Sequence, residues 1–224
     1  MLKNVWKKTQ ASVCSIRFVS SDNISVAGFS GFKVNHYLIT NKAVTSVSSA
    51  KEVVLKFVNP DGFTTRLEKR IPYEQFKTLA IQSDEIDNQD FAIFNIAFPE
   101  FSNLPSLDLS HNNTETIGQS VAMIGFNQSV GNLSIHQGLI SSKKKKKNGS
   151  EHYEFEGFVK NGFTGGPVIN LETMEVIAIL DTSNSETARM YYDLKKIANA
   201  NIERLLQVKN KLSIGDIDPV QVLI

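Results

Sequence analysis

Apolar and polar residues alternate in short runs along most of the chain, which is the pattern of half-buried β-strands. Residues 53–58, Val-Val-Leu-Lys-Phe-Val, form one such run, which ends at the turn-forming sequence Asn-Pro-Asp-Gly over residues 59–62. Near the N-terminus, alternation places Cys14, Ile16 and Phe18 on one apolar face. The pattern therefore predicts a chain built mainly of β-strands.

Two segments have a helical period instead. Residues 4–10 are expected to form a short lead-in helix. Beyond Asp193, which suits an N-cap, apolar residues recur at spacings of three and four, and this predicts an amphipathic helix. These apolar positions are Leu194, Ile197, Ala198, Ile202, Leu205 and Leu206.

The last residues, 216–224, end in a strand-like apolar sequence that includes Val220, Val222 and Ile224. An exposed strand of this kind favours aggregation, so we expect it to pair with another sheet edge, in this subunit or in a neighbour. The tail is thus the main indication of a protein partner or of self-assembly.

Residues 162–167 read Gly-Phe-Thr-Gly-Gly-Pro and carry the candidate chemistry. Acyl transfer needs a hydroxyl held against a carbonyl carbon, with backbone N–H groups aimed at the oxygen that becomes negative. Glycines allow the tight bends that present these groups. A glycine-rich turn before proline also suits an ordinary hairpin, so the rest of the chain has to decide.

The chain resembles the trypsin-like serine proteases, closest to the high-temperature-requirement branch. The segments that carry the resemblance occur in the family's order, at residues 11–18, 28–34, 37–44, 90–96, 121–126, 133–141, 162–167, 168–171 and 175–179. The resemblance implies an all-β fold of two six-stranded Greek-key β-barrels with a C-terminal α-helix. Residues 1–108 would form the N-terminal lobe and 109–192 the C-terminal lobe, with the helix and tail at 193–224. Together they would make one trypsin-like domain, without the PDZ module that such proteases often carry.

The same resemblance assigns the catalytic positions, and two of them differ from the family pattern. Ala43 stands at the histidine position, Asp90 at the acid position and Thr164 at the serine position, while Gly162, Phe163 and Thr164 form the oxyanion loop. The general base is missing, and the β-branch of threonine restricts its χ1 angle. Removing the nucleophile or base of such a unit costs about a million-fold in turnover.

No other residue is expected to replace the base. In an extended strand His36 would lie ~23 Å from Ala43, and Lys42 would point to the opposite face from its neighbour. His136 falls at a family position that is not associated with catalysis.

The net charge is +1, so no overall field attracts nucleic acid or anionic membranes. One local basic run is predicted to be a solvated loop between two strands, with docking on phosphates or on an acidic partner as the alternative. It consists of Lys143, Lys144, Lys145, Lys146 and Lys147. No metal or cofactor site is expected. The single cysteine, Cys14, reads as a buried thiol in a reducing compartment, and without an apolar signal core at the N-terminus we expect an intracellular protein or a virion component.

The leading hypothesis is a catalytically inactive protease homologue that serves as a structural or protein-binding module, for example in a viral particle. The alternative is a weak or atypical endopeptidase with Thr164 as nucleophile. A third alternative is that both triad changes were introduced in the laboratory; Phe163 beside Thr164 favours natural divergence.

Overall fold

The computed structural model describes residues 1–81, 90–110, 115–145 and 151–182. They contain, in order, α1 (Leu2–Thr9), η1 (Gln10–Ser12), β1 (Val13–Val19), β2 (Ser25–Val34), β3 (Tyr37–Asn41), η2 (Lys42–Ser46), β4 (Glu52–Val58), β5 (Thr65–Pro72), α2 (Tyr73–Thr78), β6 (Phe91–Asn95), η3 (Pro99–Phe101), β7 (Ser120–Asn127), β8 (Asn132–Lys145), β9 (Glu151–Gly157), β10 (Pro167–Asn170) and β11 (Val176–Ile179). The predicted helix after Asp193 and the apolar tail lie outside the described residues.

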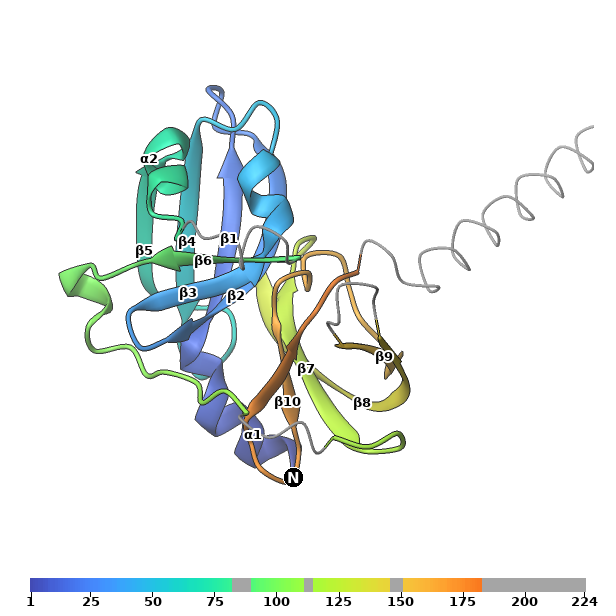
Figure 1. The fold of residues 1–224 in the computed structure, drawn as a ribbon. Helices are drawn as coiled ribbons and strands as arrows, with labels where there is room; N and C mark the ends of the chain where they lie inside the picture. The colour runs from blue at the N-terminus through green and yellow to red at the C-terminus, as the bar shows by residue number, and fades with distance from the viewer. Residues whose placement is uncertain (82–89, 111–114, 146–150, 183–224) are drawn as a thin grey trace, which may run out of the picture. The chain divides into compact units, whose positions relative to one another are not determined.

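The first sheet has six antiparallel strands in the order β5-β4-β1-β2-β3-β6 (Figure 1). The chain after α2 also pairs with the free side of β6, through bonds of 2.8 Å from the Ile81 amide to the Ile93 carbonyl and from the Asn95 amide to the Leu79 carbonyl. Because side chains alternate along β1, Cys14, Ile16 and Phe18 all point into one buried core, as the sequence predicts. Burial also raises the pKa of the Cys14 thiol, because the thiolate would lose its hydration there.

The second sheet has five antiparallel strands in the described part of the chain, in the order β11-β10-β7-β8-β9. The family resemblance predicts six, so the expected strand count is met for the first sheet and not for these residues of the second. A small apolar core lies against this sheet, and Phe163 of the candidate nucleophile loop is part of that core. The two antiparallel sheets agree with a chymotrypsin-type fold.

A third apolar cluster joins the two sheets and the N-terminal helix. Phe32 and Ile39 of the first sheet meet Ile124 and Phe126 of the second, and Val5 of α1 packs into the same cluster. All five side chains are buried. This shared core fixes the relation between the sheets, and the predicted site residues lie at their junction.

The first three lysines of the run, Lys143 to Lys145, belong to a strand and not to the predicted loop. The strand β8 continues through Lys145 and pairs with β9, with Lys143 opposite Tyr153 and Lys144 opposite His152. The Lys144 ammonium forms an ion pair with Glu154, and the Lys143 ammonium lies 5.1 Å from the Tyr153 ring centroid. Strand pairing with an acidic and aromatic neighbour overcomes the repulsion between the lysines. Lys146 and Lys147 lie outside the described residues.

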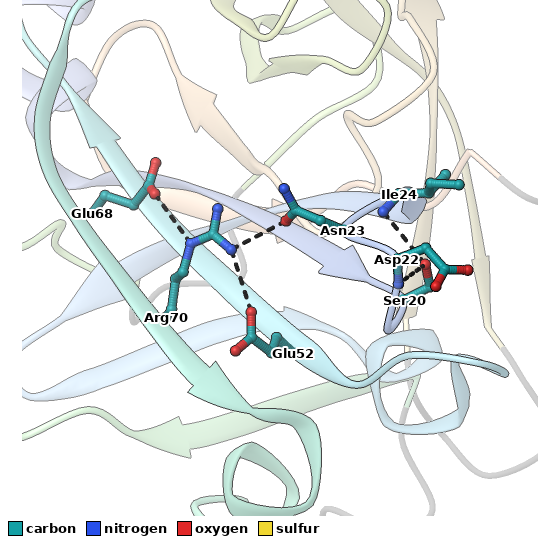
Figure 2. Close-up of polar contacts among 7 residues, drawn as sticks. All are labelled: Ser20, Asp22, Asn23, Ile24, Glu52, Glu68 and Arg70. Carbon is teal, nitrogen blue, oxygen red and sulfur yellow. Dashed lines mark hydrogen bonds and ion pairs between the residues drawn. The ribbon is translucent and has the colours of Figure 1, made fainter.

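A polar network fastens the turn between β1 and β2 to the neighbouring strands (Figure 2). Arg70 of β5 donates to Asn23 at 3.2 Å and to Glu52 at 3.3 Å, and its Nε lies 3.8 Å from Glu68. Within the turn, the Ser20 hydroxyl oxygen accepts the amides of Asp22 and Ile24. Such exposed contacts fix the path of the turn more than they stabilise the fold. Among the described helices, none is long and apolar enough to cross a membrane.

Candidate functional site

The predicted base position lies where β3 ends and a 3-10 turn begins. The sequence predicts an extended strand through residue 44, but the strand ends at Asn41 and η2 follows. Asn41 causes this change, because its side-chain oxygen accepts the amide of Ala43 at 2.9 Å and so caps the turn. Val44 is buried, whereas Ala43 is exposed. The expectation that Lys42 and Ala43 point to opposite faces is therefore wrong, since it assumed strand geometry.

The predicted acid position lies beside this turn. The carbonyl of Asp90 accepts the amide of Lys42 at 2.9 Å, and the next residue, Phe91, pairs with Asn41 in the ladder between β3 and β6. The pairing of two strands that are far apart in sequence thus places Asp90 next to the residue that precedes Ala43. Asp90 is exposed.

The predicted nucleophile loop consists of two consecutive tight turns. The Phe163 amide donates to the Lys160 carbonyl at 3.1 Å, and the Gly166 amide donates to the Phe163 carbonyl at 2.8 Å. The third residue of each turn is a glycine with positive φ, +98° at Gly162 and +88° at Gly165. A type II turn requires this backbone at its third position, which explains why glycines stand there.

The loop packs directly on the first sheet. The Ser30 amide donates to the Thr164 carbonyl at 2.8 Å, and the Ser30 hydroxyl donates to the Gly162 carbonyl at 2.7 Å. A Cβ atom on Gly165 would lie 2.2 Å from the Ser30 carbonyl oxygen, 2.2 Å from Thr40 Oγ1 and 2.9 Å from the Asn41 amide. The loop therefore touches the end of β3, two residues before Ala43, and the structure brings all three predicted triad positions into one region.

The Thr164 hydroxyl is hydrogen-bonded to another threonine hydroxyl. Its Oγ1 atom lies 2.5 Å from Oγ1 of Thr182, three residues beyond the end of β11. A neutral threonine hydroxyl is not a base at ordinary pH, so this contact orients the Thr164 side chain without activating it. The sequence reasoning missed Thr182, because nothing in the local pattern distinguishes it from other polar residues after a strand.

Two backbone donors flank Phe163 at the predicted oxyanion position. The amides of Gly162 and Thr164 have no hydrogen-bond acceptor among the residues that the structure describes. Phe163 itself is fully buried, which holds the backbone on either side of it. The loop is thus a packed turn with two backbone N–H groups that lack an acceptor among the described residues, and paired donors of this kind suit an anionic or carbonyl oxygen.

Neither candidate histidine lies where it could serve Thr164 as a base. His36 precedes β3, at the end of the strand opposite Ala43, and its carbonyl accepts the Ile96 amide at 2.9 Å. His136 of β8 lies near the loop, with its ring centroid 5.4 Å from that of Phe163, although no contact between its ring and the Thr164 hydroxyl is present within the described residues. Its Nε2 is buried and has no hydrogen-bond partner within the described part of the chain. Burial lowers the pKa of His136, and the positive charge of Lys160 lowers it further.

The other predicted site residues either lie outside the described residues or belong to the hairpin of β8 and β9. Val220, Val222 and Ile224 lie outside the described residues, and Lys143 and Lys144 lie on the hairpin formed by β8 and β9. Within the described ranges, no group of three or more His, Cys, Asp or Glu residues is arranged to hold a metal ion.

Comparisons with known proteins place the chain in a family. Its residues 26–179 match the family model described as a trypsin-like peptidase domain. The solved structures that it resembles include a serine endoprotease from Yersinia pestis, with 20% identity, a TM-score of 0.57, and coverage of 80% of this chain and 56% of that one. They also include the HtrA-type protease AlgW with tripeptide, with 20% identity, a TM-score of 0.59, and coverage of 80% of this chain and 53% of that one. A third is Deg5, with 19% identity, a TM-score of 0.61, and coverage of 81% of this chain and 84% of that one.

These structural likenesses show a shared fold. The chain spans about half the length of the first two proteins, 56% and 53%. No curated protein sequence matches it. Because the family model covers more than half of the 224 residues, the chain belongs to the family of trypsin-like peptidase domains.

Proposed function

We propose that this chain is a catalytically inactive trypsin-like peptidase homologue that works as a protein-binding or structural module. The observation that carries the proposal is the hydrogen bond between the hydroxyls of Thr164 and Thr182 at 2.5 Å. In an active enzyme of this kind the nucleophile's hydroxyl faces an imidazole that removes its proton. Here its partner is a second alcohol.

The base position supports the same proposal. Ala43 stands where the family resemblance expects a histidine and follows Lys42, whose amide donates to the Asp90 carbonyl; its methyl group has no acid or base function. Loss of the base or the nucleophile alone costs about a million-fold, which corresponds to ~8 kcal/mol of activation free energy. The amides of Gly162 and Thr164 would supply only the residual stabilisation of the transition state.

A fluorophosphonate probe tests the proposal on the purified full chain. Such probes react with activated hydroxyl nucleophiles, so we expect no labelling at Thr164 under conditions in which a trypsin-like protease is labelled completely. Stoichiometric labelling that disappears in the Thr164→Ala variant would overturn the proposal in favour of an atypical endopeptidase.

A second experiment tests whether restoring the catalytic residue types is enough to restore peptide cleavage on this fold. The double variant Ala43→His with Thr164→Ser restores the residue types of a triad around Asp90, so we expect it to cleave a casein substrate slowly. The two single variants are the controls, and both should remain inactive because the groups act as one unit. Casein cleavage by the unmodified chain as fast as that by an active double variant would contradict the proposal.

The proposed module has two candidate uses that follow from its surface. The region around the loop would accept an extended peptide beside the second sheet without cutting it. Alternatively, the chain is a building block of a larger assembly, to which the apolar tail at Val220, Val222 and Ile224 would contribute. Light scattering on the full chain and on a chain ending at Gly215 separates these uses, because only the second predicts that truncation dissociates an oligomer.

A further inference from the structure

The strand β8 extends past the end of its neighbour β7. The two strands pair as far as Leu139, and the last bonds on this side are made by Ile140. Its amide donates to the Gln119 carbonyl at 3.0 Å, and its carbonyl accepts the Gly118 amide at 2.8 Å. Over residues 141–145, β8 pairs with β9 on its other side, and no strand in the described part of the chain takes the place of β7. Alternate residues of a strand direct their N–H and C=O groups to opposite sides, so β9 satisfies only one side of this segment.

This edge of β8 is exposed and basic. Ser141, Lys143 and Lys144 are all exposed. The Lys143 ammonium makes no ion pair within the described ranges and lies 5.1 Å from the Tyr153 ring centroid. The Lys144 ammonium forms an ion pair with Glu154 of β9. The edge therefore combines an open strand backbone with excess positive charge.

The lysines restrict which strand this edge can accept. Like charges on opposite residues of neighbouring strands are destabilising, whereas opposite charges stabilise the pair. Pairing with a second copy of the same edge would bring lysines together, and lysine at a sheet edge generally prevents such contacts. An acidic strand would instead place carboxylates near Lys143 on one face and Lys144 on the other, because successive side chains point to opposite faces.

The open backbone favours a peptide over other polyanions. An added strand both donates and accepts hydrogen bonds along its length, as this edge does, whereas a phosphate backbone can only accept them. Single-stranded nucleic acid also needs exposed aromatic faces on which bases stack. The Tyr153 ring beside these lysines is half-buried and already in contact with Lys143.

We infer that the edge of β8 over residues 141–145 binds an acidic, extended segment of a partner protein, which pairs with β8 as an added strand. Backbone hydrogen bonds supply the affinity in this mode of recognition, and the lysines supply the selectivity for acidic sequences. The inference goes beyond the proposed function, because the edge can bind its partner whether or not Thr164 acts as a nucleophile.

The test is binding of a fluorescein-labelled peptide of alternating Glu and Val residues to the full chain, measured by fluorescence polarisation at low salt. The same peptide with Gln in place of Glu tests the role of charge. A version N-methylated at each Glu and Val tests strand pairing, because it keeps the carboxylates and loses the N–H donors. We expect each change to weaken binding about tenfold, and added salt to weaken the preference for Glu over Gln.

A variant and a mapping experiment assign the effect to this edge. Lys143→Gln breaks no ion pair with a described residue, and it should reduce the preference for the acidic peptide several-fold. Lys3→Gln is the matched control, since Lys3 is an exposed lysine on α1, and it should leave the preference unchanged. Amide hydrogen exchange should slow over residues 141–145 when the acidic peptide binds, and should stay the same in β5, the outer strand of the first sheet. Thermal unfolding of both variants checks that the fold is retained.

Equal binding of the acidic peptide and its N-methylated version would overturn the inference, because the lysines would then attract anions without strand pairing. Tighter binding of a labelled oligothymidylate that protects the same amides would assign the edge to nucleic acid instead. Absence of binding, or protection only outside residues 141–145, would also overturn it. Fluorophosphonate labelling of Thr164 reports on the proposed function separately, since labelling would contradict that proposal and leave this inference standing.

Discussion

The nucleophile loop and the base position touch the same end of β3 but are held in different ways. The loop is fixed by packing, because Phe163 is fully buried and Gly165 has no space for a side chain. The base position is held by hydrogen bonds to its backbone, from the Ala43 amide to the Asn41 side-chain oxygen at 2.9 Å and from the Ser46 hydroxyl to the Ala43 carbonyl at 3.3 Å, and its side chain is exposed. The fold therefore requires the loop sequence, whereas only the reaction would require a histidine at residue 43. Retained glycines in the loop indicate a retained fold and say little about activity.

The largest expected effect is that of Gly165→Ala. The added Cβ would lie 2.2 Å from Ser30 O and from Thr40 Oγ1, and the backbone has a φ of +88°. Backbone strain of ~1–2 kcal/mol and overpacking of ~1–3 kcal/mol should together lower the free energy of unfolding by about 3 kcal/mol or more. Urea denaturation of the variant and the unmodified chain measures the difference.

Gly118→Ala is the matched control for this substitution. Gly118 also has a positive φ, +87°, but no atom lies within 4 Å of an added Cβ. We expect only the backbone strain, ~1–2 kcal/mol. Equal losses at Gly165 and Gly118 would show that packing against β3 does not hold the loop.

The second prediction concerns the hydroxyl that joins the loop to both sheets. The buried Ser30 Oγ donates to the Gly162 carbonyl at 2.7 Å and accepts the Phe126 amide at 2.8 Å. Ser30→Ala leaves both of these backbone groups without that partner, so we expect a loss of ~2 kcal/mol in the free energy of unfolding. Ser15→Ala, at the paired position of β1, is the control and should cost less. If the two variants lose the same amount, the contact with the loop is not what stabilises this position.

The third prediction is a pH dependence of the folding stability that arises from His136, whose ring lies 5.4 Å from that of Phe163. Burial lowers the pKa of His136 in the folded chain, whereas in the unfolded chain it titrates near 6.5. Between these two values the unfolded chain binds more protons, so the stability contributed by the neutral ring is present above pH 6.5 and is lost as pH falls toward the folded pKa. Thermal unfolding between pH 7.5 and 5 should show this decrease.

The variant His136→Gln removes that titration, so its unfolding temperature should change less over the same interval. The carboxylates with lowered pKa values act in a separate window, because Asp61, Glu100 and Glu154 titrate below about pH 4.5. An identical slope between pH 7.5 and 5 in the variant and the unmodified chain would rule out His136 as the source.

Sequence reasoning predicted most of the first sheet because its signals are local. Alternation in β1 predicted the buried face with Cys14, and the family motifs predicted β3 up to Asn41 and β6 from Phe91. The glycines of residues 162–166 likewise predicted a tight turn. These features depend on periodicity and backbone conformation, which neighbouring residues determine.

One error has a local cause, because the Asn41 side chain caps the turn that ends β3. The other errors arise from contact between distant segments. The lysine run looked like a solvated loop, but cross-strand pairing with β9 extends β8 through Lys145. The hydroxyl contact of Thr164 with Thr182, and the position of His136 behind Phe163, depend on how β8 and β11 approach the loop. No local pattern encodes such approaches, so they require the structure.

The smallest effect is expected at the base position itself. Ala43 is exposed, and only its backbone amide takes part in the cap from Asn41. Ala43→Ser keeps that amide and adds a small polar group to the surface, so the free energy of unfolding should change by less than ~0.5 kcal/mol. The matched comparison is Asn41→Ala, which removes the cap and should cost ~1 kcal/mol. A loss at Ala43 as large as that at Asn41 would mean that the fold constrains this side chain, and the contrast between a packed loop and an unconstrained base position would fail.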